Sequence, residues 1–457
     1  MEDNASRTKG RDTSPECLGN EKDIHNIYMS LYYIPNYKTS SPKELFVGNV
    51  TATASLPPCQ GRVNDDSFSA FESIYRQTNY SRFIVNLDSH VLNTKDIGYT
   101  IFKIIQPFFA FKDRTVSLVI THDGKKLQQI ADAVHTMHKV QEARLLSMLP
   151  PNIGYPMRMA REIQSIFYKC KGVRVKVLNA EALKRMGMNL ILSVGGSAVN
   201  KPCVVIVERP GSKNKQSKTV CIAGKGITFD SGGLALKPLS GMVDMKYDKI
   251  GAVYGVYALR ELVDDVNLNG HTLVGVFPFA ENVVSGSSTR PGDVVKSYSG
   301  KTVEIVNPDA EGRLILADAL SFACDTYKPD IIIDIATLTG NAGAVNCFQT
   351  AYYYASNAKV RELVYNVGDE TRELMNPMPP WMEYAYQLKS TVADIKNANL
   401  DLKCESFIAT LFLWSFVPSD TTWVHFDLSN AVVKGIPTGK GIIAVVTMLK
   451  KYLSTKK

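Results

Sequence analysis

Two stretches, TVCIAGKGITFDSGG (219–233) and IIIDIATLTG (331–340), decide the fold of this chain. Each begins with a short run of apolar, largely β-branched residues and passes directly into glycines, threonines and acids. An apolar run of roughly four to eight residues with little alternation is typical of a strand buried on both faces of a sheet. The polar residues that follow each run are therefore expected where a strand leaves the sheet.

Similar apolar runs recur between residue 170 and the end of the chain and alternate with segments of helical periodicity. We expect strands at 173–177, 204–207, 219–222, 273–277, 331–335 and 424–428, and helices at 156–169, 251–262, 312–326, 406–416 and 441–453. Alternating strands and helices imply crossover connections, so we predict an α/β fold whose mostly parallel mixed sheet is covered by helices on both faces. In such sheets ligands bind outside the carboxyl ends of the strands.

The chain divides into three parts. Residues 1–25 are polar and mixed in charge, which predicts a disordered tail. Residues 26–150 contain apolar runs at 83–87 and 116–120 and a helical stretch at 125–146, and we expect a smaller N-terminal accessory α/β domain there. Pro150 and Pro151 interrupt the pattern, so the larger α/β domain is placed at 151–457.

The composition excludes several classes of protein. Of the 457 residues, 45% are hydrophobic and 21% are charged, which is ordinary for a globular protein and unlike collagen, a coiled coil or a disordered chain. No apolar run approaches the roughly 18–20 residues of a membrane span, so we expect no membrane partner. The 52 Lys and Arg exceed the 44 Asp and Glu by 8, but they form no long basic run, so we favour a solvated surface over a nucleic-acid patch.

The cysteines and the beginning of the chain bear on the compartment. The eight cysteines include no Cys-x-x-Cys pair and no dense module, which predicts buried free thiols in a reducing compartment. Residues 1–20 lack the apolar core of a signal peptide. We therefore expect a cytoplasmic protein.

Four carboxylates stand at loop ends beside the apolar runs: Asp230, Asp248, Asp309 and Glu311. Buried carboxylates must be paired, protonated or bound to metal. Hard or borderline divalent ions prefer oxygen ligands, and two such ions about 3.5–4 Å apart share carboxylates in some hydrolases. The His-Glu-x-x-His pattern and a cysteine cluster are both absent, so the sequence favours a carboxylate metal centre over a single His/Cys zinc site.

Each of these motifs also has a simpler interpretation. Gly232 and Gly233 would serve equally as a turn, and Lys225 would pair with any nearby acid. Asp309 and Glu311 would serve as caps of the helix that begins near residue 312. Taken singly, these simpler interpretations are favoured, and only the joint occurrence of the motifs points to a site.

Two further features are interpreted as structural. The stretch GIPTGK (435–440) is similar to a phosphate-binding loop, but its spacing is one residue short and no Ser or Thr follows Lys440. We interpret it as the N-terminus of the final helix. His425 lies in an apolar run and is interpreted as a core histidine rather than as a metal ligand.

Taken together, the motifs resemble the leucyl (cytosol) aminopeptidases, a family of two-metal exopeptidases. Residues 307–314 (NPDAEGRL) match the family signature Asn-Thr-Asp-Ala-Glu-Gly-Arg-Leu at all but one position, and residues 224–233 (GKGITFDSGG) match its other metal-binding segment fully. Residues 285–293, 336–340 and 423–427 are also similar to family blocks. The resemblance covers about 150–455, which implies that 151–457 is a catalytic metallopeptidase domain.

The resemblance implies a role for each matching residue. Two divalent ions per subunit, Zn²⁺ or Mn²⁺ or both, would be held by Lys225, Asp230, Asp248, Asp309 and Glu311, with Asp230 and Glu311 bridging. Lys237 would stabilise the oxyanion of the tetrahedral intermediate, and Arg313 would hold a bicarbonate that acts as the general base. The substrate cleft would be lined by Met245, Thr337, Leu338 and Gly340.

The implied activity is the removal of N-terminal residues, preferentially leucine or another apolar residue, from peptides with a free N-terminus by way of a metal-bridging hydroxide. Because the substrate's α-amine would bind one ion, only an N-terminus would be cleaved. The implied assembly is a homohexamer.

The chain departs from the family pattern in segments expected to line the cleft or the subunit contacts. Pro308 replaces the signature threonine, and Lys249 and Ile250 replace a small or apolar residue and a glycine. The Trp-Arg-x-Pro block is not evident, and residues 403–408 replace the Gly-Arg-x-Ala-Gly-Ala block. Two other functions therefore stay open: a dipeptidase of narrowed specificity, for example for Cys-Gly, and a nucleic-acid-binding or assembly role.

Overall fold

The computed structural model describes residues 25–31, 52–53, 82–87, 116–122, 127–212, 216–340, 342, 350–378, 381–400, 404–433 and 435–454. The chain separates into two units, residues 1–138 and 139–457. Apart from His25, the predicted tail lies outside the described residues, and the domain boundary at residue 150 stays a prediction.

The first unit contains a four-stranded sheet in the order β1-β4-β3-β2. Its strands are β1 (His25–Leu31), β2 (Ala52–Thr53), β3 (Arg82–Leu87) and β4 (Val116–His122). β1 runs antiparallel to β4, whereas β3 runs parallel to both β4 and β2. The two strands predicted in this region are β3 and β4, and the predicted helix is α3 (Leu127–Ser147), which begins in the first unit and ends in the second.

The second unit is built on a nine-stranded sheet in the order β14-β13-β16-β12-β7-β9-β6-β5, with β8 paired to β9. The strands are β5 (Arg174–Leu178), β6 (Cys203–Arg209), β7 (Thr219–Gly224), β8 (Gly226–Asp230), β9 (Thr272–Asn282), β12 (Ile331–Ala336), β13 (Ala351–Ala355), β14 (Met375–Pro377) and β16 (Thr422–Asp427). The central strands β16, β12, β7 and β9 are parallel, and the antiparallel pairs lie toward the two edges. The predicted mostly parallel mixed sheet is confirmed.

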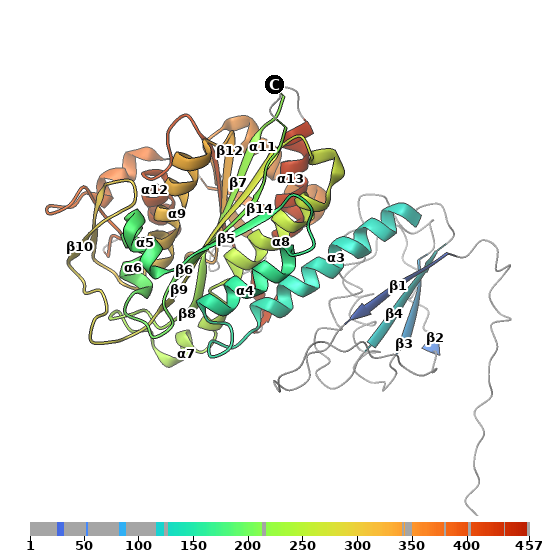
Figure 1. The fold of residues 1–457 in the computed structure, drawn as a ribbon, viewed down its shortest axis with the longest axis horizontal. Helices are drawn as coiled ribbons and strands as arrows, with labels where there is room; N and C mark the ends of the chain where they lie inside the picture. Colours follow the sequence, from blue (N-terminus) through green and yellow to red (C-terminus); the bar gives the residue numbers. More distant parts are fainter. Residues whose placement is uncertain are drawn as a thin grey trace, which may run out of the picture. The chain divides into compact units, whose positions relative to one another are not determined.

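Helices cover both faces of this sheet (Figure 1). One face carries α4 (Pro156–Phe167), α8 (Ile250–Asp264), α11 (Ala358–Thr371) and α13 (Ile442–Ser454); the other carries α5 (Ala180–Met186), α6 (Asn189–Gly195), α9 (Glu311–Tyr327) and α12 (Glu405–Trp414). The central helices α8 and α9 are buried along most of their length, and every residue of β12 is buried. Strands with apolar side chains on both faces require this double cover, because burial of apolar surface stabilises the fold.

Short elements complete the second unit. They are α7 (Leu239–Met242), η3 (Met245–Tyr247), η4 (Val266–Leu268), η5 (Met382–Leu388), the sheet of β10 (Asp293–Lys296), β11 (Thr302–Ile305) and β15 (Ile395–Lys396), and the hairpin of β17 (Val432–Val433) and β18 (Ile436–Pro437). No helix in the described part of the chain has the length and apolar character needed to cross a membrane.

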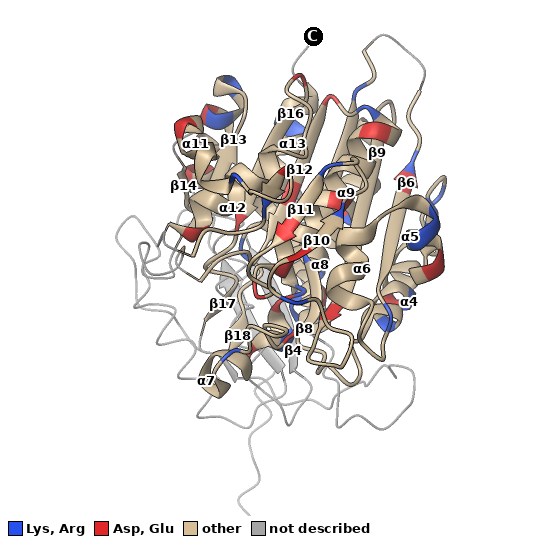
Figure 2. Ribbon diagram, turned by 90° about the vertical axis from the view of Figure 1, so that its left-hand side faces the viewer, with Lys and Arg blue, Asp and Glu red and all other residues tan. Residues whose placement is uncertain are grey.

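Acids and bases are mixed on the helices that face solvent. Figure 2 shows blue and red segments close together on α5 and on α11. Neither helix therefore presents a uniformly basic face.

The stretch 435–440, interpreted from the sequence as the N-terminus of the final helix, precedes α13 and contains β18, and the N–H groups of its last two residues are already paired. The Gly439 N–H donates to the Tyr254 hydroxyl at 2.7 Å, and the Lys440 N–H donates to the Thr438 hydroxyl at 3.2 Å. Within the first turn of α13, the Ala444 N–H donates to the buried Glu373 carboxylate at 2.8 Å. A carboxylate of the chain itself thus complements the positive end of this helix.

The cysteines of the described residues, Cys170, Cys203, Cys221, Cys324 and Cys404, are free thiols. Cys203, Cys221 and Cys324 are buried as predicted, whereas Cys170 is half-buried and Cys404 is exposed.

Candidate metal centre

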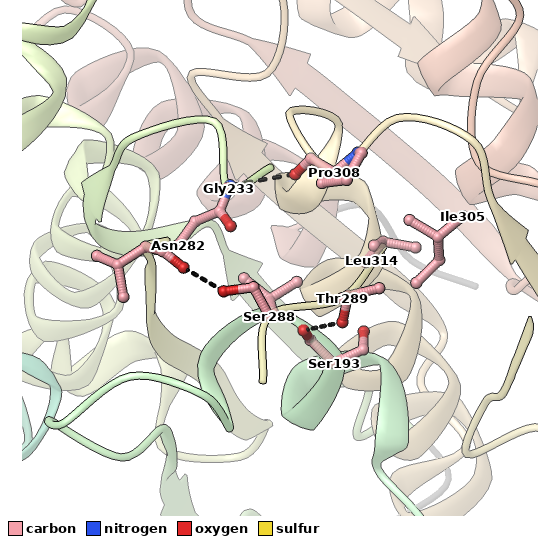
Figure 3. Close-up of a pocket in the computed structure, with 10 residues that line it drawn as sticks. Ser193, Gly233, Asn282, Ser288, Thr289, Ile305, Pro308 and Leu314 are labelled. Carbon is pink, nitrogen blue, oxygen red and sulfur yellow. Dashed lines mark hydrogen bonds between the residues drawn. The ribbon is translucent and has the colours of Figure 1, made fainter. Parts of the chain in front are cut away.

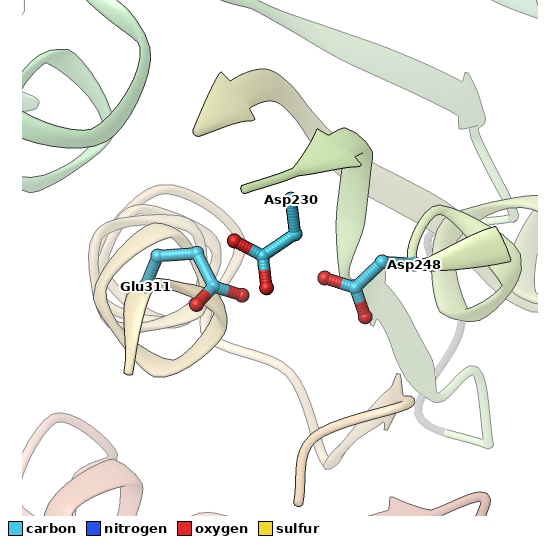
Figure 4. A group of neighbouring side chains, drawn as sticks. All are labelled: Asp230, Asp248 and Glu311. Carbon is cyan, nitrogen blue, oxygen red and sulfur yellow. The ribbon is translucent and has the colours of Figure 1, made fainter. Parts of the chain in front are cut away.

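The acidic residues singled out in the sequence come together at the ends of β7 and β8. Asp230 is the last residue of β8, Asp248 follows η3, and Glu311 is the first residue of α9. One carboxylate oxygen from each lies within 4.8 Å of the others, and all three residues are buried. Figure 4 shows the three carboxylates pointing toward one another.

An irregularity in β8 directs Asp230 into this cluster. β8 pairs with β9 with Ile227 opposite Ala280 and Phe229 opposite Glu281, so Thr228 is one residue too many on the β8 side. Side chains of a regular strand alternate between the two faces, and residues five apart, such as 225 and 230, would point to opposite sides. The extra residue reverses the alternation once, so Asp230 shares a face with its partner Asn282 and returns to the side of Lys225.

Two lysines each lie between two carboxylates. The Lys225 Nζ is 2.7 Å from Asp248 Oδ2 and 2.8 Å from Glu311 Oε1. The Lys237 Nζ is 2.8 Å from Asp230 Oδ2 and also contacts Asp309 Oδ1. Lys237 thus joins Asp309, which is outside the group of three, to the rest of the centre.

The negative charge of this centre exceeds its positive charge. Burial raises the pKa of Asp248 well above its usual value, and the nearby Glu311 and Asp230 raise it further although Lys225 opposes them. Burial and the Asp230 carboxylate likewise raise the pKa of Asp309 to about 6. Burial alone would lower the pKa of Lys225, but the surrounding carboxylates raise it above its ordinary value.

The donor set of the centre fits divalent cations. Four carboxylates face two lysines, so full ionisation would leave two negative charges uncompensated in a largely buried place. Apart from the lysine contacts, no donor of the described residues reaches Asp248 Oδ2, Asp309 Oδ1 or Glu311 Oε1. Buried oxygens of this kind are the ligands that hard and borderline divalent ions prefer.

Neighbouring groups hold the carboxylates in place. Asp230 Oδ1 accepts hydrogen bonds from the Gly232 N–H at 2.9 Å and from Asn282 Nδ2 at 2.8 Å. Asp248 Oδ1 accepts from the Thr337 hydroxyl at 2.8 Å, and the Thr337 carbonyl accepts from Lys225 Nζ at 3.0 Å. Partners of this kind orient ligands and raise the affinity of a site for metal.

Two glycines are required by this geometry. Gly232 has a φ of 85° and lies in the turn after β8, so the predicted turn exists and also delivers an N–H to Asp230. At Gly312 a Cβ would lie 2.4 Å from Lys225 Cε, because the lysine side chain runs across the first turn of α9.

The capping alternative for the start of α9 is not supported by the structure. The N-cap residue of α9 is Ala310, and it makes no side-chain capping hydrogen bond. Glu311 lies inside the first turn, where its charge suits the helix dipole, but its Oε1 faces Lys225 rather than the helix backbone.

Arg313 is buried beside the centre. Its Nη1 donates to the Asn397 carbonyl at 2.8 Å, whereas its Nε is buried without a partner among the described residues. Burial lowers the pKa of Arg313 to about 10, a value that leaves the guanidinium charged at neutral pH, and nearby acids, Glu311 first, oppose the lowering. A charged planar group with an unpaired donor is suited to a planar anion.

Two residues near the proposed ligands, Lys249 and Pro308, depart from the family pattern. Lys249 is fully buried, and its Nζ donates to the carbonyls of Leu149 and Lys246, away from the carboxylates. Burial lowers the pKa of Lys249 to about 7. Pro308 contributes only its carbonyl, which accepts from Asn282 Nδ2 at 3.1 Å.

The residues expected to line the substrate cleft occupy two nearby segments. Met245 opens η3 and is half-buried, and Asp248 N–H donates to its carbonyl at 3.4 Å. Thr337, Leu338 and Gly340 follow β12, and of these only Thr337 hydrogen-bonds to the metal-centre groups within the described part of the chain. The Leu338 N–H donates to Asp427 Oδ1 at 3.0 Å.

Three residues of this region were missed by the sequence reasoning, namely Asn282, Asn397 and Asp427. Asn282 ends β9, and the polar pair Glu281-Asn282 directly after an apolar run was the signal that could have found it. Asp427 ends β16 in the same way and holds the segment after β12 through Leu338 and Thr339. Asn397 follows a two-residue strand and has no comparable signal.

A small pocket lies beside the metal centre, and three residues described above, Gly233, Asn282 and Pro308, line it. It is lined by Ser193, Val194, Gly233, Asn282, Val283, Ser288, Thr289, Ile305, Pro308 and Leu314 (Figure 3). Its hydroxyls are paired within the protein: Thr289 donates to the Ser193 carbonyl at 2.5 Å, and Ser288 donates to the Val283 carbonyl at 2.8 Å.

A second buried cluster lies between β12 and β16. Asp334 Oδ1 is 2.6 Å from His425 Nδ1, and the Trp423 Nε1–H donates to Asp334 Oδ2 at 2.6 Å. Asp334 and His425 are fully buried, and Trp423 is 1% exposed. The interpretation of His425 as a core histidine is confirmed.

Comparison with known proteins gives the family. Residues 141–447 match the model of the cytosol aminopeptidase family, catalytic domain, and the chain belongs to this family. A probable cytosol aminopeptidase of Brucella melitensis is 36% identical over 320 residues, which are 70% of this chain and 64% of that protein. The chain thus spans slightly less than two thirds of the length of the curated relatives it matches.

Solved structures agree with this membership. A leucine aminopeptidase of Caenorhabditis elegans superimposes with a TM-score of 0.77 at 27% identity, covering 87% of this chain and 83% of that one. The bottromycin maturation enzyme BotP in complex with Mn superimposes with the same TM-score of 0.77 at 25% identity, covering 86% and 89%. The resemblance expected from the sequence is therefore confirmed, as is the α/β fold.

Proposed function

We propose that this chain is a metal-dependent aminopeptidase that binds two divalent ions and removes an apolar residue, preferentially leucine, from the N-terminus of a peptide. The observation that carries the proposal is the group of three buried carboxylates within 4.8 Å, joined through Lys237 to a fourth. Membership of the cytosol aminopeptidase family supports the reaction class.

The proposed ligands are Lys225, Asp230, Asp248, Asp309 and Glu311. Asp230 and Glu311 are proposed as shared ligands, because both belong to the group of three with Asp248 and both raise the pKa of Asp309. As a ligand, Lys225 must be the neutral amine, which burial and two adjacent dications favour. When bound, the ions would act as Lewis acids that polarise the scissile carbonyl and activate water. Because the similar enzyme BotP was solved in complex with Mn, we propose Mn²⁺ as a candidate ion alongside Zn²⁺.

The other roles follow from charge and position. Lys237 has its Nζ at the edge of the centre and is partly exposed, so it can reach a substrate carbonyl and stabilise the negative charge that develops there. Burial lowers the pKa of Lys237, but Asp230 and Glu311 outweigh burial and raise it, so the amine is charged at neutral pH. Arg313 is proposed to hold a bicarbonate through its unpaired Nε.

The segment after β12 is proposed to bind the peptide together with Met245. Leu338 is half-buried and supplies an apolar contact, Thr337 supplies backbone and hydroxyl groups, and exposed Gly340 leaves room for the chain. A free α-amine binding to one ion would restrict the reaction to N-terminal residues. We propose a homohexameric assembly from family membership alone.

The experiment is hydrolysis of leucyl amide by protein loaded with Mn²⁺ or Zn²⁺, with N-acetyl-leucyl amide as the matched control. Cleavage of the first compound and not of the second is expected, because acetylation removes the amine. A dipeptide panel that includes Cys-Gly and charged N-terminal residues measures the preference. Folded, metal-loaded protein that cleaves none of these substrates would contradict the proposal.

A further inference from the structure

The side chain of Asn397 is fully buried against the loop 306–310, which carries one of the proposed ligands. Its Oδ1 accepts hydrogen bonds from the Val306 N–H at 2.9 Å and from the Asn307 N–H at 3.2 Å. Its Nδ2 donates to the Asn307 carbonyl at 2.7 Å and to the Ala310 carbonyl at 3.4 Å. An asparagine amide has two donors and one oxygen that accepts two bonds, so all of its capacity is spent on this loop.

The main chain of Asn397 extends the same contact in two directions. Its N–H donates to the Glu304 carbonyl at 2.9 Å, which continues the parallel pairing of β11 and β15 by one residue. Its carbonyl accepts from Arg313 Nη1 at 2.8 Å. One residue therefore fixes the end of β11, the loop after it and the guanidinium in the first turn of α9.

Besides Asn397, the loop is contacted by Asn282 Nδ2, which donates to the Pro308 carbonyl, and by Lys237, which pairs with Asp309, but neither reaches a backbone N–H of the loop. The loop lies between the end of β11 and the start of α9, so it belongs to no strand or helix. The Asp309 N–H donates to the Asn307 side chain at 2.9 Å and the Ala310 N–H to the Asn307 carbonyl at 3.1 Å, while proline at 308 has no N–H. The remaining two N–H groups, those of Val306 and Asn307, donate their hydrogen bonds to Asn397 Oδ1.

We propose that Asn397 is a positioning residue that sets the places of Asp309 and Arg313 relative to the rest of the metal centre. This inference rests on the proposed function and deepens it. Asp309 is the proposed ligand that stands on the loop, whereas Lys225, Asp230 and Asp248 come from segments that Asn397 does not touch. Loss of the amide therefore weakens the ion that depends on Asp309 more than the other ion.

The experiment compares Asn397→Ala and Asn397→Asp with the control Asn399→Ala. The aspartate variant keeps the shape and the accepting oxygen but has no N–H to donate to the two carbonyls. Asn399 lies two residues further on, and its amide donates to the Gln387 side chain at 2.6 Å. The control thus removes a nearby amide that does not contact the loop.

Calorimetric titration with Mn²⁺ is the first measurement. We expect two classes of site in the wild type and the control, and in both Asn397 variants a loss of about 10- to 100-fold in affinity in one class only, as is common for residues that orient ligands. On leucyl amide, kcat should fall by a similar factor while KM changes by less than about threefold. Equal weakening of both classes, or affinities that match the control, would overturn the proposal.

Amide hydrogen exchange on the metal-free proteins is the second measurement, and it requires no activity. The amides of Val306 and Asn307 should lose protection in Asn397→Ala and keep it in Asn399→Ala, because only the first variant removes their acceptor. Unchanged protection at both amides would overturn the inference even if the wild type hydrolyses peptides. Lost protection in a protein whose wild type hydrolyses nothing would reject the proposed function while leaving the role of Asn397 in the loop supported.

Discussion

Two buried clusters of ionisable side chains lie on the same nine-stranded sheet, one at the ends of β7 and β8 and the other between β12 and β16. In the first, Asp230, Asp248 and Glu311 converge with Asp309 nearby, and two lysines oppose them. In the second, a single acid, Asp334, meets the imidazole of its cross-strand partner His425 and the indole N–H of Trp423.

The difference between the clusters lies in how the carboxylate oxygens are satisfied. Both oxygens of Asp334 have a partner at 2.6 Å, and one histidine can balance its one negative charge. In the first cluster, buried oxygens of Asp248, Asp309 and Glu311 face only lysine amines. The pair of Asp334 and His425 can balance its charge, although His425 Nε2 is buried without a partner among the described residues. In the first cluster, an excess of buried carboxylates indicates cations that complete the site.

The largest expected effect is the loss of a shared ligand. Glu311→Ala or Asp230→Ala should lower hydrolysis of leucyl amide by more than about 10³-fold, because metal-ion catalysis supplies several kcal/mol. Metal content measured by mass spectrometry should fall below that of the wild type. Asp325→Ala is the control, since it removes an exposed carboxylate from the same helix, α9. Wild-type turnover in either ligand variant would contradict the assignment.

The next effect separates charge stabilisation from metal binding. Lys237→Ala or Arg313→Ala should lower turnover by about 10²- to 10³-fold, the size typical of a lost oxyanion donor. Metal content should stay near two ions per chain, because neither residue is a proposed ligand. Lys359→Ala, an exposed lysine on α11, is the control. If the lysine or arginine variant loses metal, its role is misassigned.

The second cluster should affect stability and its pH dependence rather than catalysis. Burial alone would lower the pKa of His425, but Asp334 outweighs it and raises this pKa above its ordinary value. A raised folded-state pKa gives stability that is fully present below the unfolded value of about 6.5 and is lost as the pH rises through the folded value. Each unit of difference corresponds to about 1.4 kcal/mol.

Urea unfolding at pH 6 and pH 9 tests this expectation. The wild type should lose more stability over the interval than His425→Gln, and Asp334→Asn should flatten the curve in the same way because it removes the partner. Metal content and turnover of His425→Gln should stay within about twofold of the wild type, since His425 contacts no proposed ligand. Parallel stability curves in all three proteins would show that the pair is not charged in the folded state.

The smallest effect concerns Pro308, the one departure inside the signature. The structure uses its carbonyl, which accepts from Asn282, and any residue supplies a carbonyl. Pro308→Thr should therefore leave turnover within about threefold and cost at most about 1 kcal/mol of stability through greater freedom of the unfolded chain. Asn282→Ala is the contrasting variant, because it removes the donor to both Pro308 and Asp230 and should lower metal affinity about 10- to 100-fold. A larger effect of Pro308→Thr than of Asn282→Ala would reverse this ranking.

Much of the fold was predictable because it rests on apolar periodicity. The strands that contain Ile331–Ile335 and Thr219–Ile222 are β12 and β7 at the centre of the sheet, and the predicted helices match α8, α9, α12 and α13 within a few residues. β8 and β13 were not predicted as strands. β8 is flanked by glycines, which are typical of turns, and ends in an acid, whereas β13 contains three consecutive tyrosines and so shows no alternation of apolar and polar residues.

The site was predictable to the extent that charge reveals it. Acids that stand beside apolar runs are conspicuous in a sequence, because burying a carboxylate is costly. Asp230, Asp248 and Glu311 were found in this way. The neutral amides of Asn282 and Asn397 carry no such mark, since asparagine is common in loops and its importance here lies in which backbone groups it meets. Hydrogen bonds to residues about 50 to 90 positions away cannot be inferred from local pattern.

The irregularity in β8 makes the centre depend on the register of a strand as well as on the kinds of residue present. Regular pairing along the whole of β8, with the same residues between Lys225 and Asp230, would leave every proposed ligand in the sequence, yet it would send the carboxylate of Asp230 to the opposite side of the strand. Such a chain would pass any comparison that checks only which residues are present. For relatives of this protein, the register of the strand between Lys225 and Asp230 is therefore as diagnostic of a working centre as the two residues themselves.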